Sequence, residues 1–295
     1  MKPSRAAGRE ANGRAGTFGA LSETRPESED WRVPPLQPVP EAEPPVAPDG
    51  WRIGPPDFVG VGAQRSGTSW WYRLISAHPD VCFERGLHRK EVHFFDTLGD
   101  RERLSPADIE RYGRHFPRPA GTALVGEWTP DYMHFPWVAR QLAQAAPEAR
   151  VLALLRDPVD RYASGFARAS RIAAENGMRD IEPRLAERHI ERSMYFEQVS
   201  RLVDVFPPER LLVLQYEACR AARDRELGRT YAFLGLDPKL GPPPEQLVPR
   251  EPRERSLPAA DRERLGELFA PDVRKLAKLL PELDVSLWPS VAERL

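Results

Sequence analysis

Three short apolar runs limit how this chain can fold. They are Phe58 to Gly62 (FVGVG), Val151 to Leu155 (VLALL) and Leu211 to Leu214 (LLVL). Each run contains only apolar residues and glycine, as in a strand buried on both faces of a sheet. A stretch with helical spacing follows each run, and strands that alternate with helices form parallel sheets. We therefore predict an α/β fold of three layers, with a central parallel sheet flanked by helices.

The turn after the first run has the composition of a phosphate-binding loop, which makes the predicted fold P-loop-like. Free N–H groups and the helix dipole attract anions where a strand gives way to a helix, and glycines let a phosphate come close. Thr68 stands where a nucleotide-triphosphate loop has its lysine, which argues against an ordinary ATPase or kinase. The candidate phosphate ligands are Arg65, Ser66, Gly67, Thr68 and Ser69.

A second candidate anion site follows the second run, in the sequence LLRDPVDRYASGF. Asp157 and Pro158 are typical of a helix start. Arg156 ends the predicted strand and Ser164 lies about two turns into the helix, so both can hold an anion at the carboxyl edge of the sheet. Alternatively, Arg156 pairs with Asp157 or Asp160 at the surface and Ser164 only packs.

Together the two stretches resemble the motifs of sulfotransferases that use 3'-phosphoadenosine 5'-phosphosulfate (PAPS). The family's 5'-phosphosulfate loop has a [KR]xGTxxL-like form, and this chain has RSGTSWW from Arg65. The family's 3'-phosphate motif, RDPxxRxxSxY, corresponds to RDPVDRYASGF from Arg156. The resemblance covers roughly residues 57–290. It implies that the loop binds the 5'-phosphosulfate, while Arg156 and Ser164 bind the 3'-phosphate. Arg65 departs from the lysine of most members, and arginine keeps the charge but cannot give up a proton.

A third stretch, HRKEVHFFD at residues 88–96, is similar to the KExHFFD segment of heparan-sulfate-type and many bacterial carbohydrate sulfotransferases. In those enzymes the glutamate is the general base, and it corresponds to Glu91. A carboxylate near an acceptor hydroxyl is suited to take its proton. His93 is the competing candidate, because members that act on phenols and steroids use a histidine from elsewhere in the chain. On a strand, Glu91 and His93 would share one face and Lys90 would lie on the other.

The stretch GEWTPDY, at residues 126–132, resembles the family's xEKTPxY segment, which lines the acceptor cleft. Trp128 replaces the lysine of the heparan-type enzymes, which implies a more apolar cleft with one cation fewer. Lys90 could partly substitute for that lysine. The resemblance thus makes Lys90 and Trp128 candidates for acceptor binding, while the other interpretation of Trp128 is a core aromatic residue.

Two further stretches have looser counterparts in the family. Ser193 and Tyr195 open a predicted helix before the third run, where Tyr195 either faces the nucleotide or packs in the core. The sequence PREPRERS holds Arg250, Arg253 and Arg255. It corresponds to a basic loop that closes over the 3'-phosphate, or else it is a solvated charged loop.

Composition limits the other classes of function. Residues 1–56 are rich in proline and polar residues, so we expect a disordered tail before a single domain at 57–295. A formal net charge of -1 gives no reason to expect nucleic-acid binding, and no apolar stretch has membrane-spanning length. Two distant cysteines and six histidines show no ligand spacing, so we expect no metal and a cytoplasmic location.

The sequence therefore predicts a sulfotransferase with PAPS as its co-substrate. It would transfer a sulfuryl group to a hydroxyl or amine of a small carbohydrate, a glycolipid or a secondary metabolite. Arg65 would stabilise the leaving phosphate and Glu91 would act as the base. The alternatives are a catalytically idle nucleotide-binding or interaction protein and, less favoured, a P-loop kinase. The sequence does not predict an oligomeric state.

Overall fold

A computed structural model describes residues 41–84, 87–121, 123–241 and 257–295 of the chain. Its centre is a sheet of four parallel strands in the order β2-β1-β3-β4. The strands are β1 (Phe58–Gly62), β2 (Gly126–Trp128), β3 (Arg150–Leu155) and β4 (Leu211–Gln215). The three apolar runs form β1, β3 and β4, as predicted. Strand β2 was not predicted, because three residues are too few for a recognisable apolar run.

Helices account for most of the remaining described chain. They are α1 (Thr68–Ser76), α2 (Phe94–Leu98), α3 (Pro106–Gly113), α4 (Val138–Ala145), α5 (Pro158–Glu175), α6 (Glu182–Glu191), α7 (Phe196–Val205), α8 (Tyr216–Ala221), α9 (Arg223–Leu234), α10 (Ala259–Leu279) and α11 (Pro289–Ala292). Short 3-10 turns are η1 (Tyr132–His134), η2 (Pro208–Arg210), η3 (Pro238–Leu240) and η4 (Val285–Leu287). Among the described residues, no helix combines the length and apolar character needed to cross a membrane.

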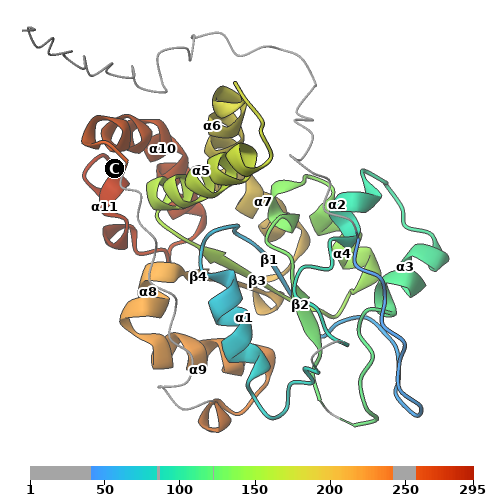
Figure 1. The fold of residues 1–295 in the computed structure, drawn as a ribbon. Helices are drawn as coiled ribbons and strands as arrows, with labels where there is room; N and C mark the ends of the chain where they lie inside the picture. The colour runs from blue at the N-terminus through green and yellow to red at the C-terminus, as the bar shows by residue number, and fades with distance from the viewer. Residues whose placement is uncertain (1–40, 85–86, 122, 242–256) are drawn as a thin grey trace, which may run out of the picture.

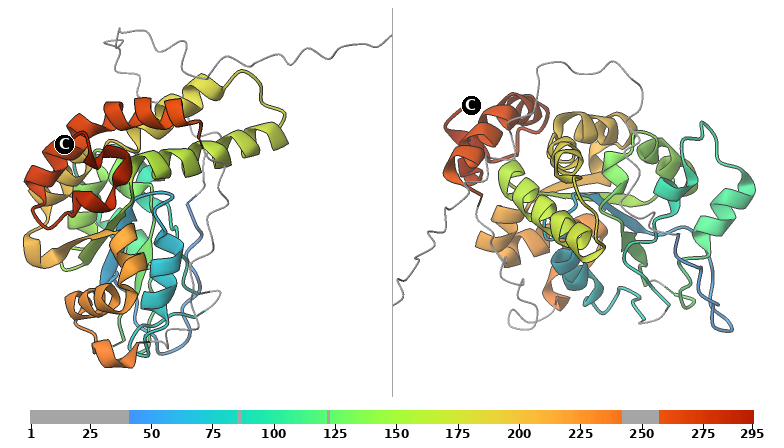
Figure 2. Two further views of the ribbon diagram at one scale, coloured as in Figure 1. Left: turned by 90° about the vertical axis from the view of Figure 1, so that its left-hand side faces the viewer. Right: turned by 45° about the horizontal axis from the view of Figure 1, so that its top comes forward.

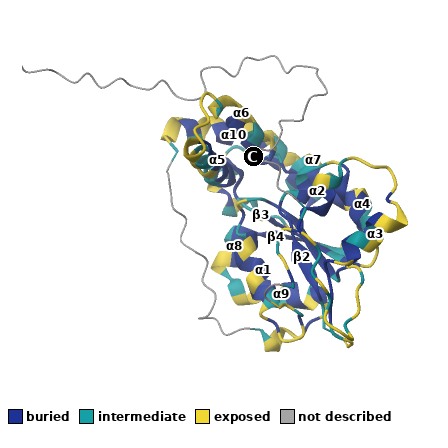
Figure 3. Ribbon diagram, turned by 45° about the vertical axis from the view of Figure 1, so that its right-hand side comes forward, coloured by how far each residue is buried: buried dark blue, intermediate teal, exposed yellow. Residues whose placement is uncertain are grey.

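Different helices cover the two faces of the sheet (Figure 1). Alternate residues of β3 belong to two separate buried clusters: Val151, Ala153 and Leu155 to one, Leu152 and Leu154 to the other. Helices α4, α7 and α10 add residues to the first cluster, and α1, α8 and α9 to the second. The strands are therefore buried between helical layers (Figure 3), which confirms the predicted three-layer fold.

Helices α5 and α6 lie side by side and extend beyond the sheet (Figure 2). Their contact buries a small apolar cluster of Ala169, Ala173 and Leu185. The side chain of Asp157 caps α5 by accepting hydrogen bonds from the N–H groups of Val159 and Asp160, as the Asp-Pro sequence predicted. The cap places the first turn of α5 directly after the carboxyl end of β3.

The boundary at residue 56 for the disordered tail is wrong, because residues 41–56 already pack on the domain. Ala42 is buried, and its N–H donates to the carbonyl of Val92 over 3.0 Å. Arg52 pairs through its backbone with Arg118, in a short antiparallel bridge. A proline-rich segment without apolar periodicity is thus held by backbone hydrogen bonds, which composition does not reveal.

Helix α10 is continuous although it contains a proline, Pro271, in its interior. Phe269 and Val273 are buried in one cluster on either side of the proline, so packing keeps the helix continuous. The helical stretch predicted after the third run consists of two helices, α8 and α9, and α9 ends at Gly235 in the left-handed conformation.

Candidate active site at the carboxyl edge of the sheet

The polar stretches singled out by their sequence meet at one edge of the sheet. In a parallel sheet the carboxyl ends of all strands lie on the same side, where ligands usually bind. The loop before α1 follows β1, Thr129 follows β2, Arg156 follows β3 and Tyr216 follows β4. The N–H group of Glu91 donates to the carbonyl of Trp128 over 3.2 Å, which brings the third stretch to the same edge.

The loop between β1 and α1 has the geometry of an anion-binding turn. Gly67 caps α1 with a φ of 86°, in the left-handed region that favours glycine. A Cβ atom on Gly67 would lie 2.6 Å from the ring of Tyr216, so the position is closed to side chains. Ser66 and Thr68 are buried, whereas Arg65 and Ser69 are exposed. The first N–H groups of α1 have no acceptor within the helix and can bind a phosphate.

The two predicted phosphate motifs are in direct contact. Arg65 donates through Nε to Ser164 Oγ over 3.0 Å, across 99 residues of sequence. Arg156 donates to the carbonyl of Arg65 over 3.4 Å and lies over the ring of Tyr216, 5.1 Å from its centre. Although Arg65 is in part exposed to solvent, its partial desolvation by the surrounding protein lowers its pKa, and so do the nearby guanidinium groups of Arg168, Arg156 and Arg171. The edge therefore concentrates positive charge suited to a ligand with several negative charges.

Arg156 also shows part of the surface pairing that the sequence left open. Its Nη2 atom lies 3.9 Å from Asp160, whose other carboxylate oxygen accepts a hydrogen bond from Arg262 over 2.8 Å. The Nε atom of Arg156 is buried and has no hydrogen-bond partner among the described residues. Its guanidinium is thus incompletely satisfied, as expected for a group that awaits a ligand.

Tyr195 packs in the core, which agrees with the second of the two interpretations that the sequence left open for it. Its side chain is fully buried, and its hydroxyl donates to the carbonyl of Arg156 over 3.0 Å. Arg161, which the sequence did not single out, is equally buried and donates to Ser193 Oγ and to the carbonyl of His189, each over 2.6 Å. These residues brace the end of β3 and the start of α5 from inside.

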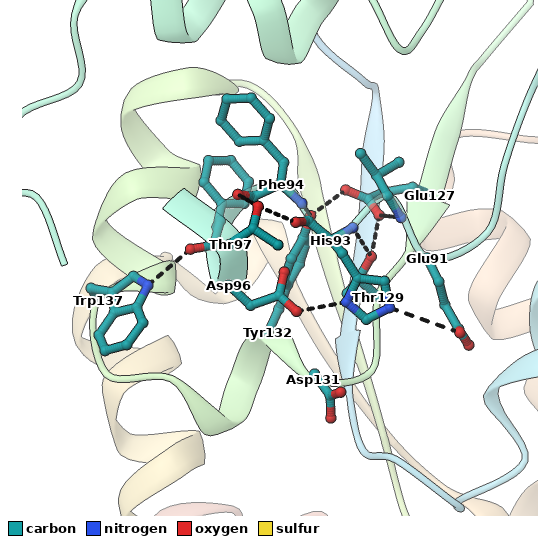
Figure 4. Close-up of polar contacts among 12 residues, drawn as sticks. Glu91, His93, Phe94, Asp96, Thr97, Glu127, Thr129, Asp131, Tyr132 and Trp137 are labelled. Carbon is teal, nitrogen blue, oxygen red and sulfur yellow. Dashed lines mark hydrogen bonds and ion pairs between the residues drawn. The ribbon is translucent and has the colours of Figure 1, made fainter. Parts of the chain in front are cut away.

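The third stretch forms a turn, so the strand geometry considered for Glu91 and His93 does not apply. Glu91 and His93 have φ values of 70° and 57°, in the left-handed region, and His93 caps the short helix α2. The two side chains nevertheless approach each other, with His93 Nε2 4.0 Å from Glu91 Oε2 (Figure 4). The turn forms because Val92, Phe94 and Phe95 are all buried, which strand alternation does not allow.

Asp96 completes a line of three ionisable groups with Glu91 and His93. Its Oδ2 lies 2.6 Å from His93 Nδ1, three residues back along the chain. Burial lowers the pKa of His93, but the hydrogen bond and charge of Asp96, together with Asp131 and Glu91, outweigh it and raise the net pKa. Asp96 lies inside the quoted motif and its spacing was visible, yet the sequence alone did not assign it a role.

Lys90 lies beside Glu91, with 2.5 Å between Nζ and Oε1. Its side chain is 17% exposed, against 46% for that of Glu91. Burial lowers the pKa of Lys90, although the carboxylates of Glu91, Glu127 and Asp131 oppose this effect. The structure therefore places a cation next to the candidate base at the mouth of the site.

Trp128 is a core residue, which corrects its assignment to acceptor binding. Its side chain is fully buried, and its Nε1 donates to the carbonyl of Gly62 over 3.1 Å. The indole fills the space above Gly60, where a Cβ atom would lie 1.9 Å from it. Trp128 thus packs against the end of β1, and its side chain has no exposed surface to offer to an acceptor.

Two remaining predictions concern metals and the basic loop. Ligand atoms of His93, Asp96 and Asp131 lie within 4.8 Å of one another, a grouping that could attract a cation. Asp131 is already ion-paired with Arg192, and Asp96 with His93. A cation bound here would have to compete with both of these ion pairs. Arg250, Arg253 and Arg255 lie outside the described residues.

Glu217, in the first turn of α8 directly after β4, makes stability depend on pH. It accepts hydrogen bonds from the N–H of Asp157 over 3.0 Å and from Trp288 Nε1 over 2.9 Å. Burial raises its pKa to about 7, from the usual 4.5. A raised carboxyl pKa stabilises the fold below the unfolded value, and this contribution is lost as pH rises through the folded value.

We expect the free energy of unfolding to fall by up to about 3 kcal/mol between pH 4.5 and 7 because of Glu217. Urea unfolding of the wild type and of Glu217→Gln across this range measures the effect. The buried carboxyls of Asp157 and Asp272 also have raised pKa values, so the difference between the two proteins is the informative quantity. Parallel pH profiles for both proteins would contradict the assignment to Glu217.

Several known proteins are similar to this chain in sequence, and a solved structure is similar to it in fold. Residues 55–250 match the family model of the sulfotransferase domain. Heparan sulfate glucosamine 3-O-sulfotransferase 6 of Mus musculus is 26% identical over 65% of this chain and 56% of its own length. The membrane-associated sulfotransferase kil1 of Dictyostelium discoideum is 30% identical over 38% of this chain and 22% of its own. The chain thus spans about half or less of these curated relatives.

A solved structure extends the comparison to almost the whole domain. The crystal structure of a sulfotransferase from Alicyclobacillus acidocaldarius aligns with a TM-score of 0.63 and 25% identity. The alignment covers 80% of this chain and 100% of the other. The family match includes both phosphate motifs and the Glu91 stretch. The chain therefore belongs to the sulfotransferase family.

Proposed function

We propose that this protein transfers a sulfuryl group from PAPS to a hydroxyl or amine of a small acceptor. The observation that carries the proposal is the contact between Arg65 and Ser164, 3.0 Å long, which joins the two phosphate motifs. A donor with phosphates on both its 5' and 3' sides needs two adjacent anion sites. The loop before α1 would bind the 5'-phosphosulfate, and Arg156 with Ser164 would bind the 3'-phosphate. The buried and unpaired Nε of Arg156 supports this assignment.

The reaction would proceed by in-line displacement, as in phosphoryl transfer. The bond between sulfur and the oxygen bridging to the 5'-phosphate breaks as a bond to the acceptor oxygen or nitrogen forms. Arg65 and the N–H groups of the loop would stabilise the negative charge that develops on the leaving phosphate. Because sulfuryl transfer has a loose transition state, positioning and electrostatics would provide most of the rate.

Glu91 is our candidate for the base that takes the acceptor's proton. Its side chain is 46% exposed at the site, whereas that of His93 is 6% exposed and engaged by Asp96. His93 remains the second candidate, since its Nε2 faces Glu91. In either case the proton leaves the acceptor as the new bond to sulfur forms. Lys90 would then exchange its contact with Glu91 for one with the acceptor or the sulfuryl oxygens.

For the acceptor we propose a small carbohydrate, a glycolipid or a secondary metabolite. The mouse relative is named for transfer to a glucosamine hydroxyl, which favours the carbohydrate class. A net charge of -1 offers no general attraction to a long polyanion. We also propose a cytoplasmic location, because Cys82 and Cys219 are both free thiols.

Titration calorimetry tests the donor assignment against the kinase alternative. We expect 3'-phosphoadenosine 5'-phosphate (PAP) to bind in the absence of metal, and ATP with Mg²⁺ to bind at least about tenfold more weakly. The reason is that Thr68 replaces the lysine that would contact a γ-phosphate, and one lost charge-assisted contact costs about 1.5–3 kcal/mol. Tight binding of ATP with Mg²⁺ and none of PAP would support a kinase instead.

A further inference from the structure

Glu127, in the middle of β2, is a buried carboxylate with an unusually complete set of partners. Its Oε2 accepts hydrogen bonds from the N–H of Val92 over 3.2 Å and from Thr129 Oγ1 over 2.5 Å. Its Oε1 accepts from the hydroxyls of Tyr112 over 2.9 Å and Tyr132 over 3.0 Å. The side chain is fully buried, so these four bonds replace its water. Burial still raises its pKa, although all four bonds lower it.

Two of these partners extend the network to the neighbouring backbone groups (Figure 4). The N–H of His93 donates to Thr129 Oγ1 over 3.4 Å, and the N–H of Phe94 donates to the Tyr132 hydroxyl over 3.0 Å. Three consecutive N–H groups, from Val92 to Phe94, are therefore held by Glu127 directly or through one hydroxyl. The carbonyl of Val92 is held from the other side by the N–H of Ala42.

The segment needs this support because of its backbone conformation. Glu91 and His93 are both left-handed, on either side of Val92. Residues in this conformation are strained and persist only where the surrounding structure holds them in place. The N–H groups of residues 92–94 belong to no strand and have no sheet partner. Their only acceptors among the described residues belong to the Glu127 network.

We propose that Glu127 is a positioning residue, whose carboxylate fixes the backbone at residues 92–94 and thereby aims Glu91 and His93 at the acceptor. The position of these side chains matters because a base can take the acceptor's proton only from within hydrogen-bond distance. Glu127 itself touches no substrate, since its side chain is fully buried. The proposal rests on the proposed function for the roles of Glu91 and His93, but the positioning itself does not depend on them.

Tyr132 and Tyr112 offer a matched pair of variants for the test. Both are fully buried, and each donates one hydrogen bond of about equal length to Glu127 Oε1. Only the Tyr132 hydroxyl also accepts from the backbone of the 92–94 segment. We expect Tyr132→Phe to lower kcat about tenfold, as for one lost hydrogen bond that acts in the transition state. Tyr112→Phe should lower it less than about threefold at a similar loss of melting temperature.

Two further variants probe the same network. Thr129→Val removes the acceptor for the N–H of His93 and should also lower kcat, with KM for PAPS unchanged. Glu127→Gln keeps one of the two acceptor oxygens. We therefore expect it to lower kcat less than Glu127→Ala does at the same temperature. A kcat that falls equally in Tyr132→Phe and Tyr112→Phe would overturn the proposal, because a merely structural role predicts equal effects.

Amide hydrogen exchange tests the positioning without any substrate. We expect faster exchange at Phe94 in Tyr132→Phe and at His93 in Thr129→Val, and unchanged exchange at residues 92–94 in Tyr112→Phe. Equal exchange in all three variants would overturn the proposal even if the enzyme is active. If the wild type transfers no sulfuryl group, the proposed function fails, while the exchange pattern still decides whether Glu127 holds this segment.

Discussion

Glu91→Gln is expected to lower kcat for sulfuryl transfer by about 10²- to 10⁴-fold, the range for loss of a general base. Glutamine has nearly the same shape but cannot accept a proton. The side chain is 46% exposed and, among the described residues, its carboxylate is ion-paired only with Lys90 and His93, so the fold should tolerate the change. Steady-state kinetics with saturating PAPS, and PAP titration to confirm intact donor binding, measure the effect.

Glu148→Gln is the matched control for this variant. Glu148 is exposed just before β3, at the amino edge of the sheet and thus opposite the site. The Glu148→Gln change removes the same negative charge as Glu91→Gln but lies away from the site, so kcat should stay within about twofold of the wild type. If Glu91→Gln turns over as fast as Glu148→Gln, Glu91 is not the base. A large loss in His93→Gln would then transfer that role to His93.

Arg156→Ala is expected to weaken PAP binding by about 10- to 100-fold, because charge-assisted hydrogen bonds to a phosphate contribute about 1.5–3 kcal/mol. The loss should be specific to the 3'-phosphate. Adenosine 5'-phosphate, which lacks that group, should bind the variant and the wild type equally well. Calorimetry with both nucleotides therefore measures the contribution of Arg156 to one phosphate.

Arg140→Ala removes a guanidinium of the same charge from the surface of α4. Its ion pair with Asp100 is 3.9 Å long and more than half exposed, so the change should alter stability and PAP affinity very little. Equal weakening of PAP and adenosine 5'-phosphate by Arg156→Ala would contradict the assignment. It would indicate that Arg156 acts on the loop through the carbonyl of Arg65.

The sequence predicted the sheet that carries the site, because buried parallel strands appear in a sequence as short runs of apolar residues. The runs that became β1, β3 and β4 contain no charged residue, and a stretch with helical spacing follows each of them. Once the strands are parallel, their carboxyl ends share one edge. The meeting of Arg65 with Ser164 follows from that rule, although the two residues lie 99 positions apart.

The residues that the sequence misplaced are those whose burial depends on the tertiary structure. Trp128 and Tyr195 lie in motifs that border the ligand site, yet both side chains point into the core. From the sequence alone, Glu127 looks like an ordinary charged residue. Its four hydrogen-bond donors come from positions up to 35 residues away, so its neighbours in the sequence do not reveal them. No local pattern reveals such a network.

The sequence did not reveal the Glu91 turn for a different reason. HRKEVH contains a single apolar residue, Val92, so it shows neither strand alternation nor helical spacing before Phe94 and Phe95. Two left-handed residues then satisfy burial of Val92 and both phenylalanines at once. Backbone strain of this kind is typical of functional sites, and propensity rules do not predict it.

Transfer of radioactive sulfate from labelled PAPS to a panel of small carbohydrate, glycolipid and secondary-metabolite acceptors tests the central claim most directly. We predict that the label appears on at least one acceptor with the wild type and with Glu148→Gln, and is strongly reduced with Glu91→Gln. PAP binding without transfer to any acceptor of the panel would contradict the claim and indicate a catalytically idle nucleotide-binding protein.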